Sequence, residues 1–112
     1  ERVLVMGEAL LDVVRTDGRT DSWPGGSAAN VAVALARLGR GVGLATCLGR
    51  DEAGQRIATH LAESGVELVG DPWRLECTST AVATTGADGS ATYDFDLEWR
   101  PGPVGRATLL AL

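Results

Sequence analysis

The sequence predicts an α/β fold in which crossover helices connect the strands of a parallel sheet and a β-hairpin lid projects from it. Over the first two-thirds of the chain, short apolar runs alternate with amphipathic segments in the order strand, helix, strand, helix, strand. The apolar runs are continuous, which is typical of strands buried on both faces. Residues 78–99 do not continue this alternation of strands and helices. Two strand-like runs flank an Asp-Gly turn there, which is the pattern of an antiparallel hairpin.

An apolar strand over residues 3–6 opens the series, residues 10–14 continue or restart it, and 15–21 read as a polar turn. Pro24-Gly25-Gly26 predicts a tight bend. Ser27 is then expected to be the N-cap of an alanine-rich helix over residues 28–38. The larger apolar residues of this helix recur at spacings of four and three and are expected to form its buried stripe. They are Val31, Leu35 and Leu38.

A second strand over residues 42–48 leads to a second helix, which Asp51 is expected to cap and which runs to about Ser64. Its inner face is predicted from the apolar positions, which are Ile57, Ala58, Leu61 and Ala62. A short third strand over residues 66–69 completes the parallel series, for which right-handed crossovers are the rule.

The predicted hairpin pairs residues 78–85 with 91–99. In its second run apolar and acidic residues alternate, so one face is apolar and the other acidic. The acidic residues Asp94, Asp96 and Glu98 could suggest acid–base chemistry, but a solvated lid face is the favoured interpretation. The apolar face packs against the body, a substrate or a second copy of the lid, and these three alternatives stay open. Its aromatic members are Tyr93, Phe95 and Trp99.

Composition excludes several classes of function. The net charge of -5 gives no basic surface for nucleic acid or an anionic membrane, and no apolar stretch approaches the roughly 18–20 residues of a membrane span. All ten Lys+Arg positions are arginine, which excludes a P-loop lysine or a Schiff-base lysine within this chain. Cys47 and Cys77 lack metal-binding spacing and are expected to be reduced thiols of a cytoplasmic protein. His60 has no partner at metal or triad spacing and is interpreted as structural.

The ends of the chain lead us to expect a piece of a longer protein. Glu1 leads directly into a strand, with no signal or transit peptide visible, and the chain closes on an apolar run over residues 106–112.

Two short segments point to a site for a polar ligand. Asp12 is expected at the carboxyl edge of the sheet, where ligands of open α/β sheets bind, and a carboxylate accepts hydrogen bonds from two hydroxyls at once. Gly25 and Gly26 allow close approach of the backbone before a helix N-terminus, and Asn30 adds an amide in the first turn. Each has an ordinary alternative: an exposed turn residue for Asp12, and a plain helix-starting turn for the glycines. Neither a dinucleotide fingerprint nor a Walker loop is present.

Four blocks of the sequence carry a resemblance. They are Gly7-Glu8-Ala9-Leu10-Leu11-Asp12, Gly25-Gly26-Ser27-Ala28-Ala29-Asn30-Val31-Ala32, Ala36-Arg37-Leu38-Gly39 and Leu48-Gly49-Arg50-Asp51-Glu52-Ala53-Gly54. In order and spacing they resemble the N-terminal part of the PfkB (ribokinase-like) carbohydrate kinase family. The opening block is closest to the fructokinase and 2-keto-3-deoxygluconate kinase branches, and the hairpin stands where that family has its lid.

The resemblance implies the N-terminal part of one ribokinase-like kinase domain, with a body over about 1–12, 25–70 and 101–112 and lid strands over about 13–24 and 75–99. It implies a transferase that moves the γ-phosphoryl group of ATP, with Mg²⁺, to a sugar hydroxyl. By position, Asp12, Gly25, Gly26 and Asn30 would bind the sugar. It also implies a homodimer formed through the lid. Asp51 and Gly54 match a family motif, although a helix N-cap explains Asp51 equally well.

The chain departs from the family in one respect. The family's Gly-Ala-Gly-Asp segment, which carries the catalytic base, has no match here, and the ATP site is built mainly from the same part. We therefore expect no catalytic residue and no metal ligand in this chain, and no activity from it alone. The alternative is a non-catalytic truncated kinase module that binds sugar or dimerises through its lid. A nucleotide-binding domain of an unrelated enzyme is disfavoured by the missing fingerprint.

Overall fold

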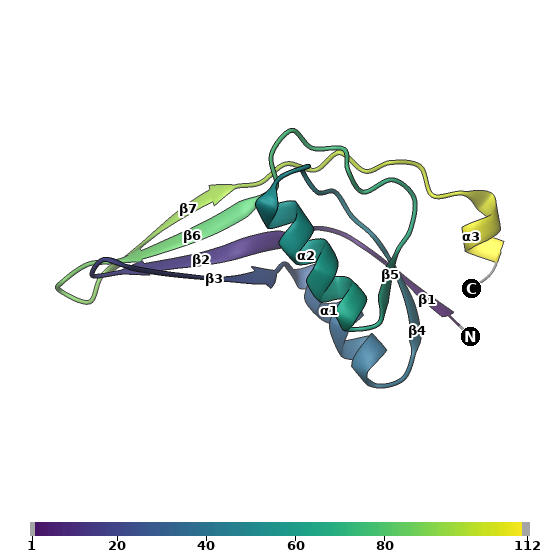
Figure 1. The fold of residues 1–112 in the computed structure, drawn as a ribbon, viewed down its shortest axis with the longest axis horizontal. Coiled ribbons are helices and arrows are strands. Elements are labelled where there is room, and N and C mark those ends of the chain that lie inside the picture. The colour runs from purple at the N-terminus through teal and green to yellow at the C-terminus, as the bar shows by residue number, and fades with distance from the viewer. Residues whose placement is uncertain (1, 111–112) are drawn as a thin grey trace.

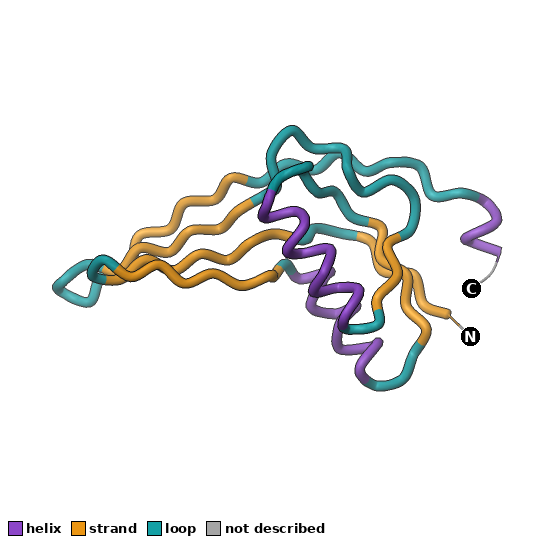
Figure 2. The backbone as a smooth tube through the Cα atoms, viewed as in Figure 1, coloured by secondary structure: helices purple, strands orange, loops and turns teal. Residues whose placement is uncertain are grey.

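The structure, a computed structural model, describes residues 2–110. Glu1 of the expected body, and Ala111 and Leu112 of the apolar C-terminal run, lie outside the described residues. The described part measures 53 × 30 × 19 Å. It is elongated because a long sheet extends from a smaller layer of strands and helices (Figure 1, Figure 2).

A three-stranded parallel sheet and two helices form one part of the molecule, which we term the body. The sheet has the order β1-β4-β5, with β1 (Arg2–Met6), β4 (Gly41–Ala45) and β5 (Val66–Leu68). Helix α1 (Ser27–Arg37) leads into β4, and α2 (Glu52–Glu63) leads into β5. Parallel strands connected through helices confirm the predicted α/β class.

A four-stranded sheet forms the other part, which we term the lid. Its order is β3-β2-β6-β7, with β2 (Leu10–Thr16), β3 (Arg19–Gly25), β6 (Thr80–Thr85) and β7 (Ala91–Asp96). Two antiparallel hairpins are joined side by side, because β2 pairs in parallel with β6. After β7 an extended segment returns along the body to the short helix α3 (Arg106–Leu110), as Figure 1 shows.

The hairpin of β2 and β3 corrects the predicted polar turn over residues 15–21. The turn is confined to Asp17 and Gly18, whose φ angles are 42° and 77°. Positive φ at both central residues matches the twist of paired strands, so the polar residues on either side continue the ladder instead of looping out. The predicted bend at Pro24-Gly25-Gly26 is likewise shortened: Pro24 and Gly25 belong to β3, and only Gly26 turns the chain.

The core lies between the parallel sheet and both helices. One buried cluster joins the alanines of α1 to Ile57 and Leu61 of α2 and to Val42 and Leu44 of β4, so the two helices cover the same face of the sheet. The predicted stripe of α1 is wrong at two of its three residues, because Val31 is 51% exposed and Leu38 is 81% exposed, whereas Leu35 is partly buried against the core. The residues that α1 buries instead are Ala28, Ala29 and Ala32.

Alanine on the buried face lets the helix lie close to the strands, which explains why the small residues and not the large ones face inward. The second helix follows its prediction more closely, since Ile57 and Leu61 are buried, but Ala62 is exposed. No helix within residues 2–110 is long and apolar enough to cross a membrane.

Candidate functional site

A cleft opens between body and lid, at the carboxyl end of β1. Its volume is about 480 Å³. One wall comes from the loop that follows β1 and the other from the segment that follows β7. The residues that line it are Met6, Gly7, Glu8, Ser79, Leu97, Glu98 and Trp99. Ligands of parallel α/β sheets bind at this edge, so the cleft stands where a substrate is expected.

Close to this junction, the structure brings Asp12 of β2 and Gly25 of β3 together. A Cβ atom built on Gly25 would overlap Oδ2 of Asp12 and lie 3.1 Å from its Cγ. The Asp12 carboxylate therefore lies against bare backbone, where any other residue at position 25 would displace it. The Asp12 side chain is half-buried, and it forms no hydrogen bond with another residue in the described part of the chain.

The start of α1 differs from the prediction that Ser27 is the N-cap. Gly26 holds that position with a φ of 102°, and Ser27 is already the first helical residue. The acceptor for its N–H comes from the chain segment after β1, because Oε1 of Glu8 lies 3.0 Å from the Ser27 nitrogen. Gly26 allows this approach, since a Cβ there would lie 2.6 Å from the Glu8 carbonyl oxygen. Glu8 thus neutralises a helix end that was expected to attract a ligand.

Asn30 occupies the first turn of α1 and is exposed. Its backbone nitrogen donates to the Gly26 carbonyl oxygen at 2.9 Å, which fixes the residue relative to the glycine pair. No hydrogen bond joins its side chain to Asp12 within residues 2–110. The two side chains come from different elements, β2 and α1, which are connected through β3 and Gly26.

Asp51 holds the predicted cap of α2: its Oδ1 accepts a hydrogen bond from the Gly54 nitrogen at 2.8 Å. The same carboxylate accepts two hydrogen bonds from Thr78, one from its nitrogen at 2.8 Å and one from its hydroxyl at 2.6 Å. Partial burial acts to raise the pKa of Asp51, but the hydrogen bonds from Thr78 and Gly54 together leave that pKa below its usual value. No local pattern marks Thr78 as a partner, because 27 residues separate it from Asp51.

The aromatic residues of β7 share a face with Asp12. Phe95 pairs with Ala81, which pairs with Asp12, and side chains at paired positions point to the same side of a sheet. Tyr93 and Phe95 are 63% and 67% exposed, and their rings stack with centroids 6.3 Å apart. Of the three uses left open for this face, packing of these two rings against the body is therefore wrong. Asp94 is exposed as well, as expected for a solvated acidic face.

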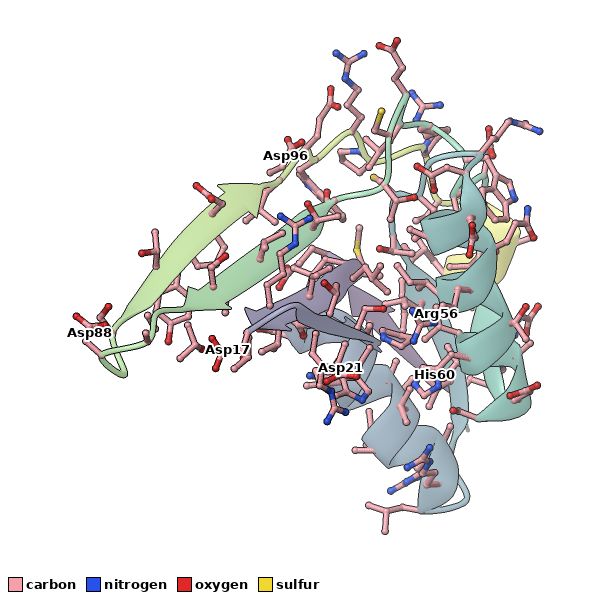
Figure 3. The ribbon with its side chains drawn as sticks, turned by 60° about the vertical axis from the view of Figure 1, so that its left-hand side comes forward. Asp17, Asp21, Arg56, His60, Asp88 and Asp96 are labelled. Atoms are coloured by element: carbon pink, nitrogen blue, oxygen red, sulfur yellow. The ribbon has the colours of Figure 1, made fainter. Side chains whose placement is uncertain are left out.

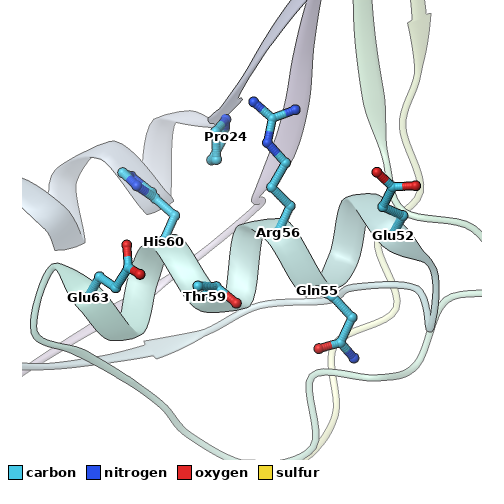
Figure 4. Close-up of a pocket in the computed structure, with 7 residues that line it drawn as sticks. All are labelled: Pro24, Glu52, Gln55, Arg56, Thr59, His60 and Glu63. Carbon is cyan, nitrogen blue, oxygen red and sulfur yellow. The ribbon is translucent and has the colours of Figure 1, made fainter.

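A second, shallow groove of about 510 Å³ runs along the outer face of α2 (Figure 4). Its lining carries charges of both signs, and none of the predicted sugar-binding residues belongs to it. Those lining it are Pro24, Glu52, Gln55, Arg56, Thr59, His60 and Glu63. Arg56 reaches across to the lid and donates to the hydroxyl and the carbonyl oxygen of Ser22. In Figure 3 it lies on α2, far from Asp17 and Asp88 at the tip of the lid.

Comparison with known proteins identifies the relatives of this fold. Residues 1–101 match the model of the pfkB family of carbohydrate kinases. The chain is 36% identical over 104 residues to fructokinase-1 of Oryza sativa subsp. japonica, covering 85% of this chain and 32% of that protein. It therefore spans about a third of the length of this relative.

Two solved structures share the fold. A carbohydrate kinase from Agrobacterium tumefaciens superposes with a TM-score of 0.77 at 25% identity, covering 86% of this chain and 35% of that one. A fructokinase with bound ATP from Xylella fastidiosa gives a TM-score of 0.69 at 29% identity, covering 86% and 33%. The fold is thus the ribokinase-like one that the sequence predicted, and the chain belongs to the pfkB family of carbohydrate kinases.

Proposed function

We propose that this chain is the sugar-binding part of an ATP-dependent, fructokinase-like sugar kinase, which transfers a phosphoryl group to a sugar hydroxyl. The observation that carries the proposal is the close approach of the Asp12 carboxylate to Gly25, near the cleft at the end of β1, although neither residue lines that cleft itself. The Asp12 carboxylate is half-buried, and adjacent hydroxyl groups of a sugar can donate to its two oxygens. Gly26 and Asn30 complete the assigned sugar site from the start of α1.

Charge favours a neutral sugar over a sugar acid. Glu8 lines the cleft, and Asp12 lies close to the same junction, and both are carboxylates. Glu98, the other acidic residue of the lining, is paired with Arg100, whose Nε lies 2.7 Å from Oε1 of Glu98. A ligand carboxylate would therefore meet like charge without a free basic partner in the lining, which supports fructose over a keto-deoxy acid.

ATP and Mg²⁺ enter this proposal through the family and through the ATP bound to the Xylella relative. The residues present do not fit a Mg²⁺ site, since the part of the chain that the structure describes holds no group of three or more His, Cys, Asp or Glu side chains placed to bind a metal. The Gly-Ala-Gly-Asp segment is also absent from the sequence. We assign no phosphoryl-transfer step to these residues and expect no turnover from the 112 residues alone.

Titration of D-fructose into the ¹⁵N-labelled chain, followed by NMR, tests the proposal. We expect shifts at residues around the cleft, and a loss of affinity of at least about tenfold for Asp12→Asn, because a charged hydrogen-bond acceptor is lost. Asp17→Asn, at the exposed tip of the lid, is the matched control and should bind as the unaltered chain does. Fructose binding that ignores Asp12→Asn would remove this residue from the site, and no binding at all would contradict the proposal.

A second candidate, dimerisation through the lid, is favoured by the exposed aromatic face. Tyr93 and Phe95 present stacked rings on a sheet whose outer strand β7 is exposed along its whole length. Exposed apolar patches on edge strands mark protein contacts, and a second lid offers the same chemistry. Sedimentation analysis should give a dimer that Tyr93→Ser with Phe95→Ser converts to monomer. A monomeric unaltered chain contradicts this candidate and leaves the sugar site in place.

We also propose a cytoplasmic location. Cys47 is buried, Cys77 is exposed, and both are free thiols. Reducing compartments keep thiols in this state. Cell fractionation tests the assignment, and recovery of the protein from an oxidising compartment would contradict it.

A further inference from the structure

A cluster of four residues connects the body to the lid. It consists of Gly49, which follows β4, of Asp51 and Gly54 at the start of α2, and of Thr78, which precedes β6; we term it the hinge cluster. The Asp51 carboxylate accepts three hydrogen bonds, from the Gly54 nitrogen and from both donors of Thr78. The Thr78 hydroxyl in turn accepts one from the Gly49 nitrogen at 2.9 Å. Thr78 is only 5% exposed; its bond from Gly49 is buried, and the three bonds to Asp51 are partly buried.

Both glycines of the cluster lie where no side chain fits. A Cβ on Gly49 would lie 2.5 Å from the Thr78 nitrogen. A Cβ on Gly54 would overlap the Gly49 carbonyl oxygen and lie 2.9 Å from the Thr78 hydroxyl. A helix cap by itself does not require such close approach. The spacing of Gly49, Asp51 and Gly54 is thus explained by the close packing of Gly49, Gly54 and Thr78 on one another, and not by the start of α2 alone.

The position of Thr78 affects the strand that carries Asp12 and the cleft wall that follows β7. The next residue, Ser79, accepts a hydrogen bond from the Leu11 nitrogen on its carbonyl oxygen at 3.0 Å, beside Asp12. The Ser79 hydroxyl accepts another from the Glu98 nitrogen at 3.1 Å, within the segment that lines the cleft. In the ladder that follows, Ala81 is paired with Asp12. A shift of Thr78 would therefore move the strand beside Asp12 and the cleft wall together.

We propose that Asp51 is a positioning residue of the sugar site, which holds Thr78 and through it fixes the lid strands against Asp12. This inference rests on the proposed function, because the effect of losing Asp51 is measured as a change in the affinity for the sugar. Capping of α2 accounts for the role of only one of the two Asp51 carboxylate oxygens, Oδ1, which accepts from the Gly54 nitrogen. The other oxygen, which accepts from the Thr78 nitrogen, has no role in the helix.

Substitutions can separate the two roles of Asp51. Asn is as good an N-cap as Asp, so Asp51→Asn keeps the Oδ1 acceptor of Gly54 and of the Thr78 hydroxyl, while it places an amide NH₂ group against the Thr78 nitrogen. Thr78→Val removes the hydroxyl at nearly constant shape, and Thr78→Ser restores it. Asp88→Asn is the matched control. Asp88 accepts the same pair of bonds from the nitrogen and hydroxyl of Ser90, at 3.0 and 2.6 Å, within the lid turn.

Two readouts on the 112-residue chain test the proposal: amide hydrogen exchange and D-fructose affinity. For Asp51→Asn and Thr78→Val we expect exchange at Leu11 and Glu98 to accelerate about tenfold, with β4 amides unchanged, and the dissociation constant to rise about tenfold. Thr78→Ser and Asp88→Asn should retain both properties.

The outcomes are distinct. Faster exchange in the lid with unchanged fructose affinity would overturn the positioning role and leave Asp51 as a structural residue. Equal acceleration in β4 would also overturn it, because the effect would then be global unfolding. If the unaltered chain binds no fructose, the proposed function fails, and the exchange data still decide whether Asp51 holds the lid.

Discussion

The body and the lid obtain their order from different sources. In the body, β4 is buried from Val42 to Ala45, and Leu44 is 0% exposed between the sheet and the helices. In the lid, every residue of β7 is exposed, including Tyr93 and Phe95. The body is therefore stabilised by apolar burial, whereas the outer lid depends on ladder hydrogen bonds and on whatever covers its aromatic face. A region of the second kind is the one that can move over a ligand.

The two carboxylates with lowered pKa values show the same contrast. Asp51 and Asp88 each accept from the nitrogen and the hydroxyl of one residue. Asp88 and Ser90 are two residues apart, so their bonds shape only a turn, whereas Asp51 and Thr78 are separated by 27 residues. Identical chemistry thus gives a local turn at the tip of the lid and a long-range attachment at its base.

The largest expected effect tests burial directly. Leu44→Ala removes a fully buried side chain of the body core and should lower the free energy of unfolding by about 2–5 kcal/mol. Phe95→Ala removes a larger side chain that is 67% exposed and should change it by less than about 0.5 kcal/mol. Urea unfolding of both variants gives the comparison. A large decrease in the free energy of unfolding for Phe95→Ala would contradict the contrast between body and lid, because it would show that the aromatic face is covered in solution.

The elements of the body could be predicted because their signals are local. Glycines at 39 and 65 end the two helices with φ angles of 88° each, and Asp51 caps the second helix as its position predicts. The β2–β3 hairpin was harder, because the two-residue turn at Asp17 and Gly18 is set within a longer polar stretch. The buried face of α1 was predicted wrongly, since hydrophobicity alone ranks Val31 above the alanines that close packing selects.

The candidate site likewise contains residues that local sequence signals predict and residues that only the folded arrangement reveals. Asp12 and Gly25 were predicted from their residue types, and the pairing of β2 with β3 brings them into contact. Glu8 belongs to the same sequence block, but its bond to Ser27 depends on how Gly26 turns the chain, which composition does not specify. Thr78 carries no signal of its own. Its partnership with Asp51 exists only because the segment that leads into β6 and the start of α2 are folded next to one another.

The next largest effect concerns the base of the lid. Gly54→Ala should improve an exposed helix by about 1 kcal/mol, because alanine is the better helix former. Here the added Cβ would overlap the Gly49 carbonyl oxygen, so we expect a loss of about 1–3 kcal/mol instead. Gly105→Ala is the control, since nothing lies within 4 Å of a Cβ at that position. Thermal unfolding measures both, and a stabilised Gly54→Ala variant would mean that the hinge cluster is looser than described.

The smallest effect is the pH dependence that Asp51 contributes. Its pKa is lowered in the folded chain, because its hydrogen bonds to Thr78 and Gly54 outweigh the opposing effect of burial. The ionised carboxylate therefore stabilises the fold above the unfolded pKa of about 3.9, and this contribution is lost as pH falls through the lower folded pKa. Urea unfolding between about pH 3 and pH 7 should show a stability gap between the unaltered chain and Asp51→Asn that narrows on acidification. Asp88 is present in both proteins and cancels from the difference, so a gap that stays constant with pH would show that the charge of Asp51 plays no part in attaching the lid.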